Sequence, residues 1–216
     1  MVESETDRVS GSRSGDDARR LPPVAAVITW MALVSLAVAG RLWQPSWNGE
    51  PLWNVTPLAG VALLSGYLFA NPLVAASVPL AALAISNLLL PGYGSLGVAA
   101  IVYAASAWPA LVGSTGLLGR GTPRWAAVLG SSLASSLVFF FSTNLAHWLF
   151  VGGYPTTAAG LGECLVAALP FYRWMPVGDA FWAVTLFGVA TAAGSIADAV
   201  EQRSLRPRGF SSRPLD

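Results

Sequence analysis

The chain contains no lysine and has only one cysteine and one histidine. Without lysine it cannot build the phosphate loop of P-loop ATPases or form a Schiff base with pyridoxal phosphate or retinal. One cysteine and one histidine cannot supply the four protein ligands of a structural zinc site, and a single cysteine cannot form an internal disulfide. We therefore expect neither a cofactor nor a metal centre. Any ATP that drives the protein must be hydrolysed by another polypeptide.

Charge is scarce as well. Charged residues make up 11% of the chain, against about 25% in an ordinary soluble domain, and 54% of the residues are hydrophobic. Three long runs, 21–40, 51–119 and 125–162, carry no charged residue. Because a membrane-spanning helix needs about 20 apolar residues, the longest run must cross the bilayer more than once. These features predict a polytopic membrane protein, and the net charge of +1 gives no reason to expect nucleic-acid binding.

Proline, glycine and asparagine divide the apolar runs into helices. Asn71-Pro72 and Pro91-Gly92, for example, each end a candidate span. The sequence predicts an all-α bundle of six transmembrane helices, at about 22–40, 54–70, 73–90, 96–118, 125–150 and 177–200. A further helix at about 158–169 is too short to span and carries Glu163, so we expect it to lie at the membrane interface.

The two ends of the chain are polar. We expect residues 1–20 to form a disordered tail and residues 201–216 to form a second polar tail. Ala37-Val38-Ala39 resembles a signal-peptide cleavage site, which leaves open whether the first helix is retained or removed. We favour a retained helix, because Pro22 and Pro23 suit the first turn of a helix.

The arginines provide an independent test of orientation. Six spans place all but two of the twelve arginines on one side of the membrane, and the exceptions are Arg41 and Arg173. Because cytoplasmic loops are enriched in positive charge, this distribution predicts that both termini lie in the cytoplasm.

With this topology, most polar side chains at membrane depth fall in the outer half. Ionisable groups inside membranes usually line a cavity or a pathway, so we predict a ligand site there. The candidate ligand-binding residues are Asn54, Asn87, Tyr103, Asn144, His147, Trp148, Asp179 and Trp182. Simpler roles are also open: helix caps for Asn54 and Asp179, hydrogen bonds between helices for Asn144 and His147, and an aromatic belt for the tryptophans.

Small residues recur at four-residue spacing in the predicted helices. Ala100-x-x-x-Ala104 occurs in the fourth, Gly130-x-x-x-Ala134 in the fifth, and Gly188-x-x-x-Ala192 and Ala190-x-x-x-Gly194 in the sixth. Such spacings allow helix backbones to approach closely, so we expect these positions to lie between helices.

Several short strings resemble a family of small bacterial membrane proteins of unknown function that are assigned to membrane transport. That family looks like the substrate-binding S-components of energy-coupling-factor (ECF) vitamin transporters. The strings lie between about residues 50 and 190 and are Asn54-Val-Thr-Pro57, Pro79-Leu80, Ser86-Asn87, Val102-Tyr103-Ala104, Thr143-Asn144, Tyr154-Pro155-Thr156-Thr157, Cys164, Pro170-Phe171, Gly178-Asp179 and Leu186-Phe187-Gly188.

The resemblance implies a multi-pass protein of the bacterial cytoplasmic membrane that takes up a vitamin or similar micronutrient. It also implies a separate ATP-hydrolysing coupling module, in addition to the surrounding lipid. We expect a binding protein, not an enzyme. Three alternatives are a scaffold or assembly subunit without a ligand, a proton-coupled carrier using His147 and Asp179, and an intramembrane protease using Ser142 and His147. The protease is the weakest, since no Gly-x-Ser-x-Gly motif occurs and a spacing of five residues separates these two side chains around the helix.

Overall fold

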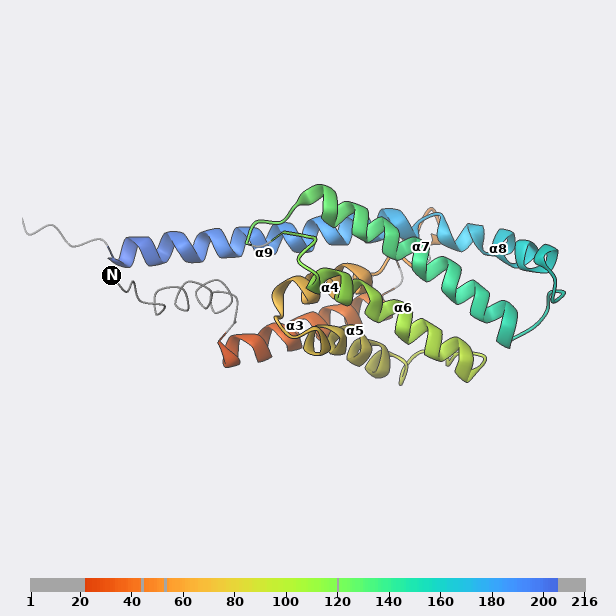
Figure 1. Cartoon of the computed structure of the whole chain (residues 1–216). Helices are drawn as coiled ribbons and strands as arrows, with labels where there is room; N and C mark the ends of the chain where they lie inside the picture. The colour runs from red at the N-terminus through yellow and green to blue at the C-terminus, as the bar shows by residue number, and fades with distance from the viewer. Residues whose placement is uncertain (1–21, 44, 53, 120, 206–216) are drawn as a thin grey trace, which may run out of the picture.

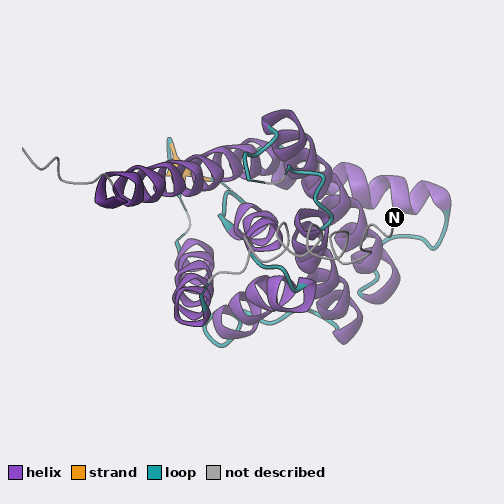
Figure 2. Cartoon of the chain, turned by 60° about the vertical axis from the view of Figure 1, so that its left-hand side comes forward, coloured by secondary structure: helices purple, strands orange, loops and turns teal. Residues whose placement is uncertain are grey.

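The structure is a computed structural model that describes residues 22–43, 45–52, 54–119 and 121–205. Seven helices account for nearly all of this part of the chain (Figures 1 and 2). They are α3 (Pro23–Leu42), α4 (Leu58–Leu68), α5 (Pro72–Ser86), α6 (Leu96–Ser114), α7 (Trp125–Phe150), α8 (Ala158–Tyr172) and α9 (Met175–Leu205). The expected tail at 1–20 lies outside the described residues, as do Arg120 and residues 206–216 of the tail expected at 201–216. Residues 201–205 of that tail instead continue helix α9.

A small hairpin interrupts the helical pattern between α3 and α4. Strand β1 (Ser46–Trp47) pairs antiparallel with β2 (Glu50–Pro51). The turn residues Asn48 and Gly49 have φ angles of 51° and 81°. An Asn-Gly pair favours this two-residue turn because both residues tolerate positive φ. The hairpin was not predicted, although this dipeptide is a strong sequence signal for one.

Local sequence signals explain where the helices begin. Pro23 and Pro72 occupy the first turns of α3 and α5, where the missing N–H group costs nothing. The side chain of Asn71 caps α5 by accepting from the backbone N–H of Leu73 at 2.8 Å. Ser95 caps α6 and Thr157 caps α8 in the same way.

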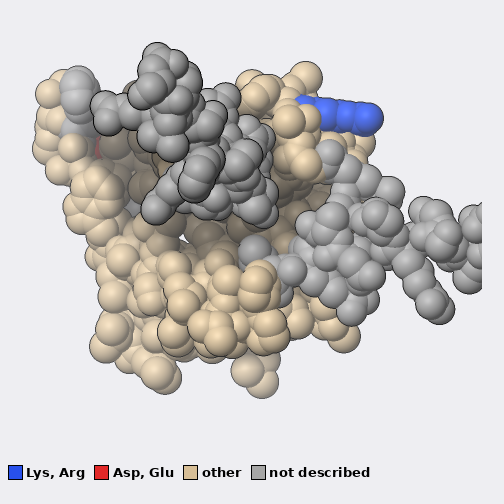
Figure 3. Space-filling model, turned by 90° about the vertical axis from the view of Figure 1, so that its left-hand side faces the viewer, with Lys and Arg blue, Asp and Glu red and all other residues tan. Residues whose placement is uncertain are grey.

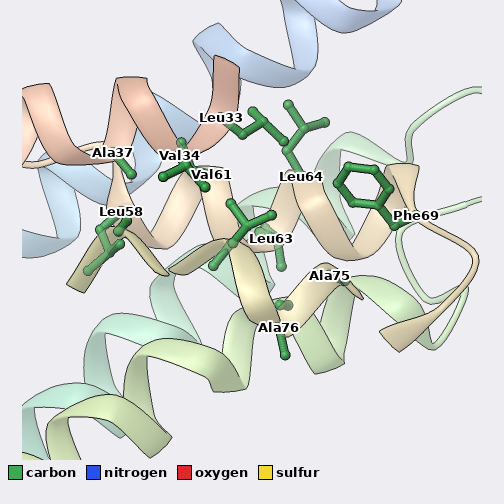
Figure 4. Close-up of a cluster of buried hydrophobic side chains, with 14 of the residues drawn as sticks. Leu33, Val34, Ala37, Leu58, Val61, Leu63, Leu64, Phe69, Ala75 and Ala76 are labelled. Carbon is green, nitrogen blue, oxygen red and sulfur yellow. The ribbon is translucent and has the colours of Figure 1, made fainter. Parts of the chain in front are cut away.

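Helix α4 lies at the centre of the bundle. It packs against α3, α5, α6, α7 and α9, and eight of its 11 residues are buried. Figure 4 shows its side chains Val61, Leu63 and Leu64 between those of α3 and α5. The helices that surround α4 instead expose apolar side chains, such as Ile28 of α3 and Val189 of α9, which are 57% and 65% exposed. An apolar exterior of this kind suits contact with lipid.

Four helices are long and apolar enough to cross a membrane, namely α3, α6, α7 and the part of α9 up to Ala197. They identify a membrane-embedded multi-pass protein. The expected spans at 54–70 and 73–90 contain shorter helices: α4 has 11 residues and α5 has 15. At a rise of about 1.5 Å per residue, these helices are about 16 and 22 Å long, less than the roughly 30 Å hydrocarbon core. A bundle of six full-length spans is therefore not observed, because other helices enclose α4 and allow its ends to be irregular.

The start of α3 and the end of α9 lie at the same end of the molecule, and α8 lies at the opposite end (Figure 1). Figure 3 views the molecule from the first of these ends, where the described surface is mainly uncharged. Helices α8 and α9 are separated only by Arg173 and Trp174. The last long helix, α9, therefore starts directly after α8.

The close contact between helix backbones does not involve the small-residue motifs from which it was predicted. A Cβ atom added to Gly130, Gly188 or Gly194 would meet nothing within 4 Å. These positions of α7 and α9 face outward, so the expectation that they lie between helices is wrong. The tight contact instead joins Gly66 of α4 to Gly113 of α6.

Candidate functional site

A small cavity lies inside the bundle where α3 ends and α9 begins. We call it the central cavity. Its volume is about 80 Å³. Six segments contribute to its wall: the end of α3, the residues just before α4, the first turn of α4, the middle of α6, the middle of α7 and the start of α9. The lining residues are Arg41, Asn54, Thr56, Leu58, Ala59, Ala105, Ser106, Pro109, Ser135, Phe139, Met175 and Asp179.

Arg41 provides the positive charge of the central cavity. It lies in the last turn of α3 and is partly buried. Its Nε atom donates to Ser86 Oγ at 2.8 Å, and its Nη2 atom donates to Asn87 Oδ1 at 3.1 Å. Asn87 Nδ2 in turn donates to the Tyr103 hydroxyl at 3.2 Å. These neutral partners hold the guanidinium in place without compensating its charge, and they use only part of its five donors.

Asp179 is the acidic residue of the central cavity. Its side chain is 3% exposed, and its Oδ2 atom accepts a hydrogen bond from the Ser136 hydroxyl at 2.6 Å. An ionised carboxylate can accept about four hydrogen bonds, so one hydroxyl donor leaves most of this capacity unused. Asp179 is not the N-cap of α9, as the simpler interpretation proposed. The helix already begins at Met175, because Pro176 suits its first turn, and Asp179 lies inside it.

The two charged groups face the same cavity but do not form a pair. Among the described residues, no ion pair joins Arg41 to an acidic side chain or Asp179 to a basic one. Burying charged groups in apolar surroundings is costly unless each has a partner. The central cavity is therefore a polar site in which Arg41 and Asp179 each have capacity for further hydrogen bonds.

Ser106 adds a third polar group to this cavity. Its side chain is 5% exposed, and its hydroxyl finds no hydrogen-bond partner among the described residues. Leaving a buried hydroxyl without a partner costs about 1–3 kcal/mol. Most buried polar groups in folded proteins do have partners, so an unpaired hydroxyl that lines a cavity is available to bind a ligand there.

A second cavity lies next to the central one and shares Asn54, Phe139 and Met175 with it. We call it the outer cavity. Its volume is about 210 Å³, and the C-terminal part of α8 forms one of its walls. The remaining lining residues are Phe140, Thr143, Asn144, Ala168, Phe171 and Tyr172. The wall is mostly aromatic, with Thr143 and the two asparagines as polar contacts.

Five of the predicted site residues lie at or beside these cavities. Asn54 and Asp179 line the central cavity, Asn54 and Asn144 line the outer one, and Asn87 and Tyr103 form the network behind Arg41. Asn54 is not a helix cap, because α4 starts only at Leu58. Its backbone has a φ of 61°, which asparagine tolerates, and its Nδ2 atom donates to the Phe171 carbonyl at 3.5 Å.

The other three predicted residues line neither cavity. His147 is exposed on α7. Trp148 donates from its Nε1 atom to the Pro155 carbonyl at 2.9 Å, which ties the loop before α8 to α7. Trp182 stacks edge-to-face with Phe181. Asn144, expected on one face with His147, donates to the Phe140 carbonyl of its own helix at 2.7 Å.

Sequence reasoning missed Arg41, Ser106 and Ser136 as site residues. Arg41 gave a signal that could have been used, because no other charged residue occurs between residues 21 and 49. Ser136 lies in a serine-rich stretch of α7, and nothing in the sequence pairs it with a carboxyl group 43 residues away. Within the described residues, no group of three or more His, Cys, Asp or Glu side chains could hold a metal ion.

Comparison with known proteins gives a family and no function. A model of a family of unknown function, DUF6580, matches residues 22–201. Comparisons with curated proteins and with solved structures give no match. The chain belongs to the DUF6580 family.

Proposed function

We propose that this membrane protein binds a small molecule in the central cavity and takes part in its uptake. The observation that carries the proposal is a polar cavity inside an otherwise apolar bundle, lined by Arg41, Asp179 and Ser106. Binding sites for small molecules typically combine apolar walls with a few polar groups that fix the ligand. Ionisable residues at membrane depth are costly and usually functional, which favours a site over an accident of packing.

The arrangement of the two cavities supports access from the end of the molecule that carries α8. The outer cavity continues the central one toward α8, while the start of α3 and the end of α9 lie at the opposite end (Figure 1). If both termini are cytoplasmic, as the arginine distribution predicts, the site faces outward. The resemblance to bacterial membrane proteins implies the bacterial cytoplasmic membrane, and we propose that location.

The proposed role is that of a binding subunit and not of an enzyme. The Ser142 hydroxyl donates to the Phe139 carbonyl at 3.3 Å instead of bonding to His147, so the pair expected of a protease does not form. If uptake is driven by ATP, a separate coupling module has to hydrolyse it, because the chain has no lysine for a phosphate loop. A vitamin or another micronutrient is the class of substrate that the S-component resemblance implies.

A cavity-filling variant tests the site directly. Ala105 lines the central cavity, whereas its neighbour Ala104 on α6 is exposed. We expect the purified full chain to be stabilised against heat by at least one member of a panel of vitamins and small metabolites, since a ligand at 100 times its Kd adds about 2.7 kcal/mol. Ala105→Leu should abolish this stabilisation and Ala104→Leu should retain it. If no compound stabilises the unmodified chain, or if both variants respond equally, the proposal is wrong.

A scaffold or assembly subunit is the second candidate. It is favoured by the outward-facing glycines Gly130 and Gly188, which leave room for another helix to approach. This role predicts stable co-purification with a membrane partner and no stabilisation by any compound of the panel.

A further inference from the structure

The charges of the central cavity indicate the chemical class of its ligand. Arg41 stands at one side of the cavity with only neutral hydrogen-bond partners, Ser86 and Asn87. Asp179 stands in another part of the wall with only the Ser136 hydroxyl. A ligand of one charge sign would satisfy one of these groups and leave the other without a charged partner.

We infer that the central cavity binds a small zwitterion of the amino-acid type, with its carboxylate at Arg41 and its ammonium group at Asp179. The inference rests on the proposed function of this site. A carboxylate accepts strong hydrogen bonds from the guanidinium donors that Ser86 and Asn87 leave free. An ammonium group has three donors for the carboxylate of Asp179, and Ser106 supplies a further hydroxyl.

The size of the central cavity fits this class. A cavity needs about 10–15 Å³ on this measure to hold one water molecule. The volume of about 80 Å³ therefore accommodates a few water molecules, or a molecule with about as many non-hydrogen atoms as glycine or β-alanine. A vitamin-sized ligand would have to occupy the outer cavity as well. There, Phe139, Phe140 and Tyr172 would contact an apolar extension of a longer amino acid.

Asn87 offers a way to change the charge at Arg41 without removing the arginine. Its Oδ1 atom already accepts from Arg41 at 3.1 Å, so Asn87→Asp would place a carboxylate oxygen there and neutralise the guanidinium. Asp179→Asn would remove the opposite charge with little change in shape. Glu163→Gln and Arg173→Ala serve as charge-matched controls, since both residues are exposed and line neither cavity.

The experiment measures binding to the purified full chain in nanodiscs by isothermal titration. The probes are glycine, β-alanine and 4-aminobutyrate, with propionate and propylamine as compounds that carry one charge only. We expect at least one zwitterion to bind at least tenfold more tightly than both single-charge compounds. Asn87→Asp and Asp179→Asn should each weaken that binding about 10- to 100-fold, as expected for the loss of a charged hydrogen-bond partner. The two control variants should bind like the unmodified chain.

Two outcomes would overturn the inference and separate it from the proposed function. If a vitamin or another compound binds and Ala105→Leu abolishes its binding, while no zwitterion is preferred and Asp179→Asn has no effect, the site exists but its ligand is not a zwitterion. If no compound of either panel binds, the proposed function fails together with the inference. Each variant is first shown to be monodisperse and to unfold at a normal temperature, so that loss of binding is not loss of fold.

Discussion

The contact between α4 and α6 and the central cavity are both buried, and they differ in how the space between helices is filled. At the contact, glycines let two backbones touch: a Cβ atom on Gly66 would lie 2.0 Å from the Ala110 carbonyl oxygen. At the cavity, the same two helices line a space together with residues of α3, α7 and α9, and Arg41, Asp179 and Ser106 border it.

This difference separates a contact that stabilises the bundle from the cavity for which we propose a ligand. Helices in membranes associate mainly through close van der Waals packing, so the glycine contact contributes stability. Buried polar groups without partners lower stability, so the cavity does the opposite. Four substitutions test this division, from the largest expected effect to the smallest.

The largest effect is expected from Gly66→Ala. The new methyl group would overlap the Ala110 carbonyl and force α4 away from α6, which should cost about 3 kcal/mol or more of the free energy of unfolding. Gly188→Ala is the matched control, because open space surrounds Gly188 and alanine favours helix by about 1 kcal/mol. Unfolding in mixed detergent micelles measures the free energy of unfolding of both variants. Equal stability of the two variants would refute the idea that this contact holds the bundle together.

Ser136→Ala removes the hydroxyl that donates to Asp179 at 2.6 Å. The carboxyl group would lose its hydrogen-bond donor inside the bundle, and we expect a loss of about 1–3 kcal/mol. Ser142→Ala on the same helix is the control, because its hydroxyl bonds only to the Phe139 carbonyl. Unfolding of the double variant Ser136→Ala/Asp179→Asn gives the coupling between the two residues, and additive effects would contradict a specific bond.

Ser106→Ala should stabilise the protein while weakening its binding of ligand. Removing a buried hydroxyl without a partner relieves a penalty of about 1 kcal/mol, and the same hydroxyl is expected to contact the occupant of the cavity. Ser132 is also buried without a partner but does not line the central cavity. Ser132→Ala should therefore stabilise to a similar degree without any effect on binding. Thermal unfolding with and without ligand separates the two variants, and an identical response would remove Ser106 from the site.

The smallest effect is expected from Tyr103→Phe. This change removes the acceptor for Asn87 Nδ2, at 3.2 Å, while Arg41 keeps both of its own hydrogen bonds. We expect a loss of about 0.5–1.5 kcal/mol in unfolding free energy. Ligand affinity should fall less than in Asn87→Asp, because the charge at Arg41 is unchanged. A larger loss of affinity than in Asn87→Asp would show that Tyr103 itself contacts the ligand.

Most helices could be located from the sequence, whereas their lengths could not. Breakers such as Asn71-Pro72 and Ser95 act on their immediate neighbours, so the starts of α5 and α6 follow from local chemistry. The short α4 does not, because its irregular approach through Asn54 and Thr56 is allowed only by the helices around it.

The candidate site, like the helices, could be predicted only in part from the sequence. Depth in the membrane singled out Asn54, Asn144 and Asp179, since polarity in an apolar run is visible in one sequence. Depth does not specify which way a side chain points, and His147 and Trp182 line neither cavity. The prediction from small residues failed for the same reason. Gly130 and Gly188 have the spacing of contact motifs but face outward.

Composition and the spacing of breakers by themselves determined that this chain is a helical membrane protein and where most of its helices begin. These signals are sufficient because the cost of exposing polar backbone to lipid acts along the chain and requires no knowledge of neighbours. Only the tertiary structure decided that α4 is central, that Gly66 and Gly113 meet, and that Arg41 and Asp179 line one cavity. Those relations depend on how helices distant in sequence rotate and pack against each other, which no local pattern records.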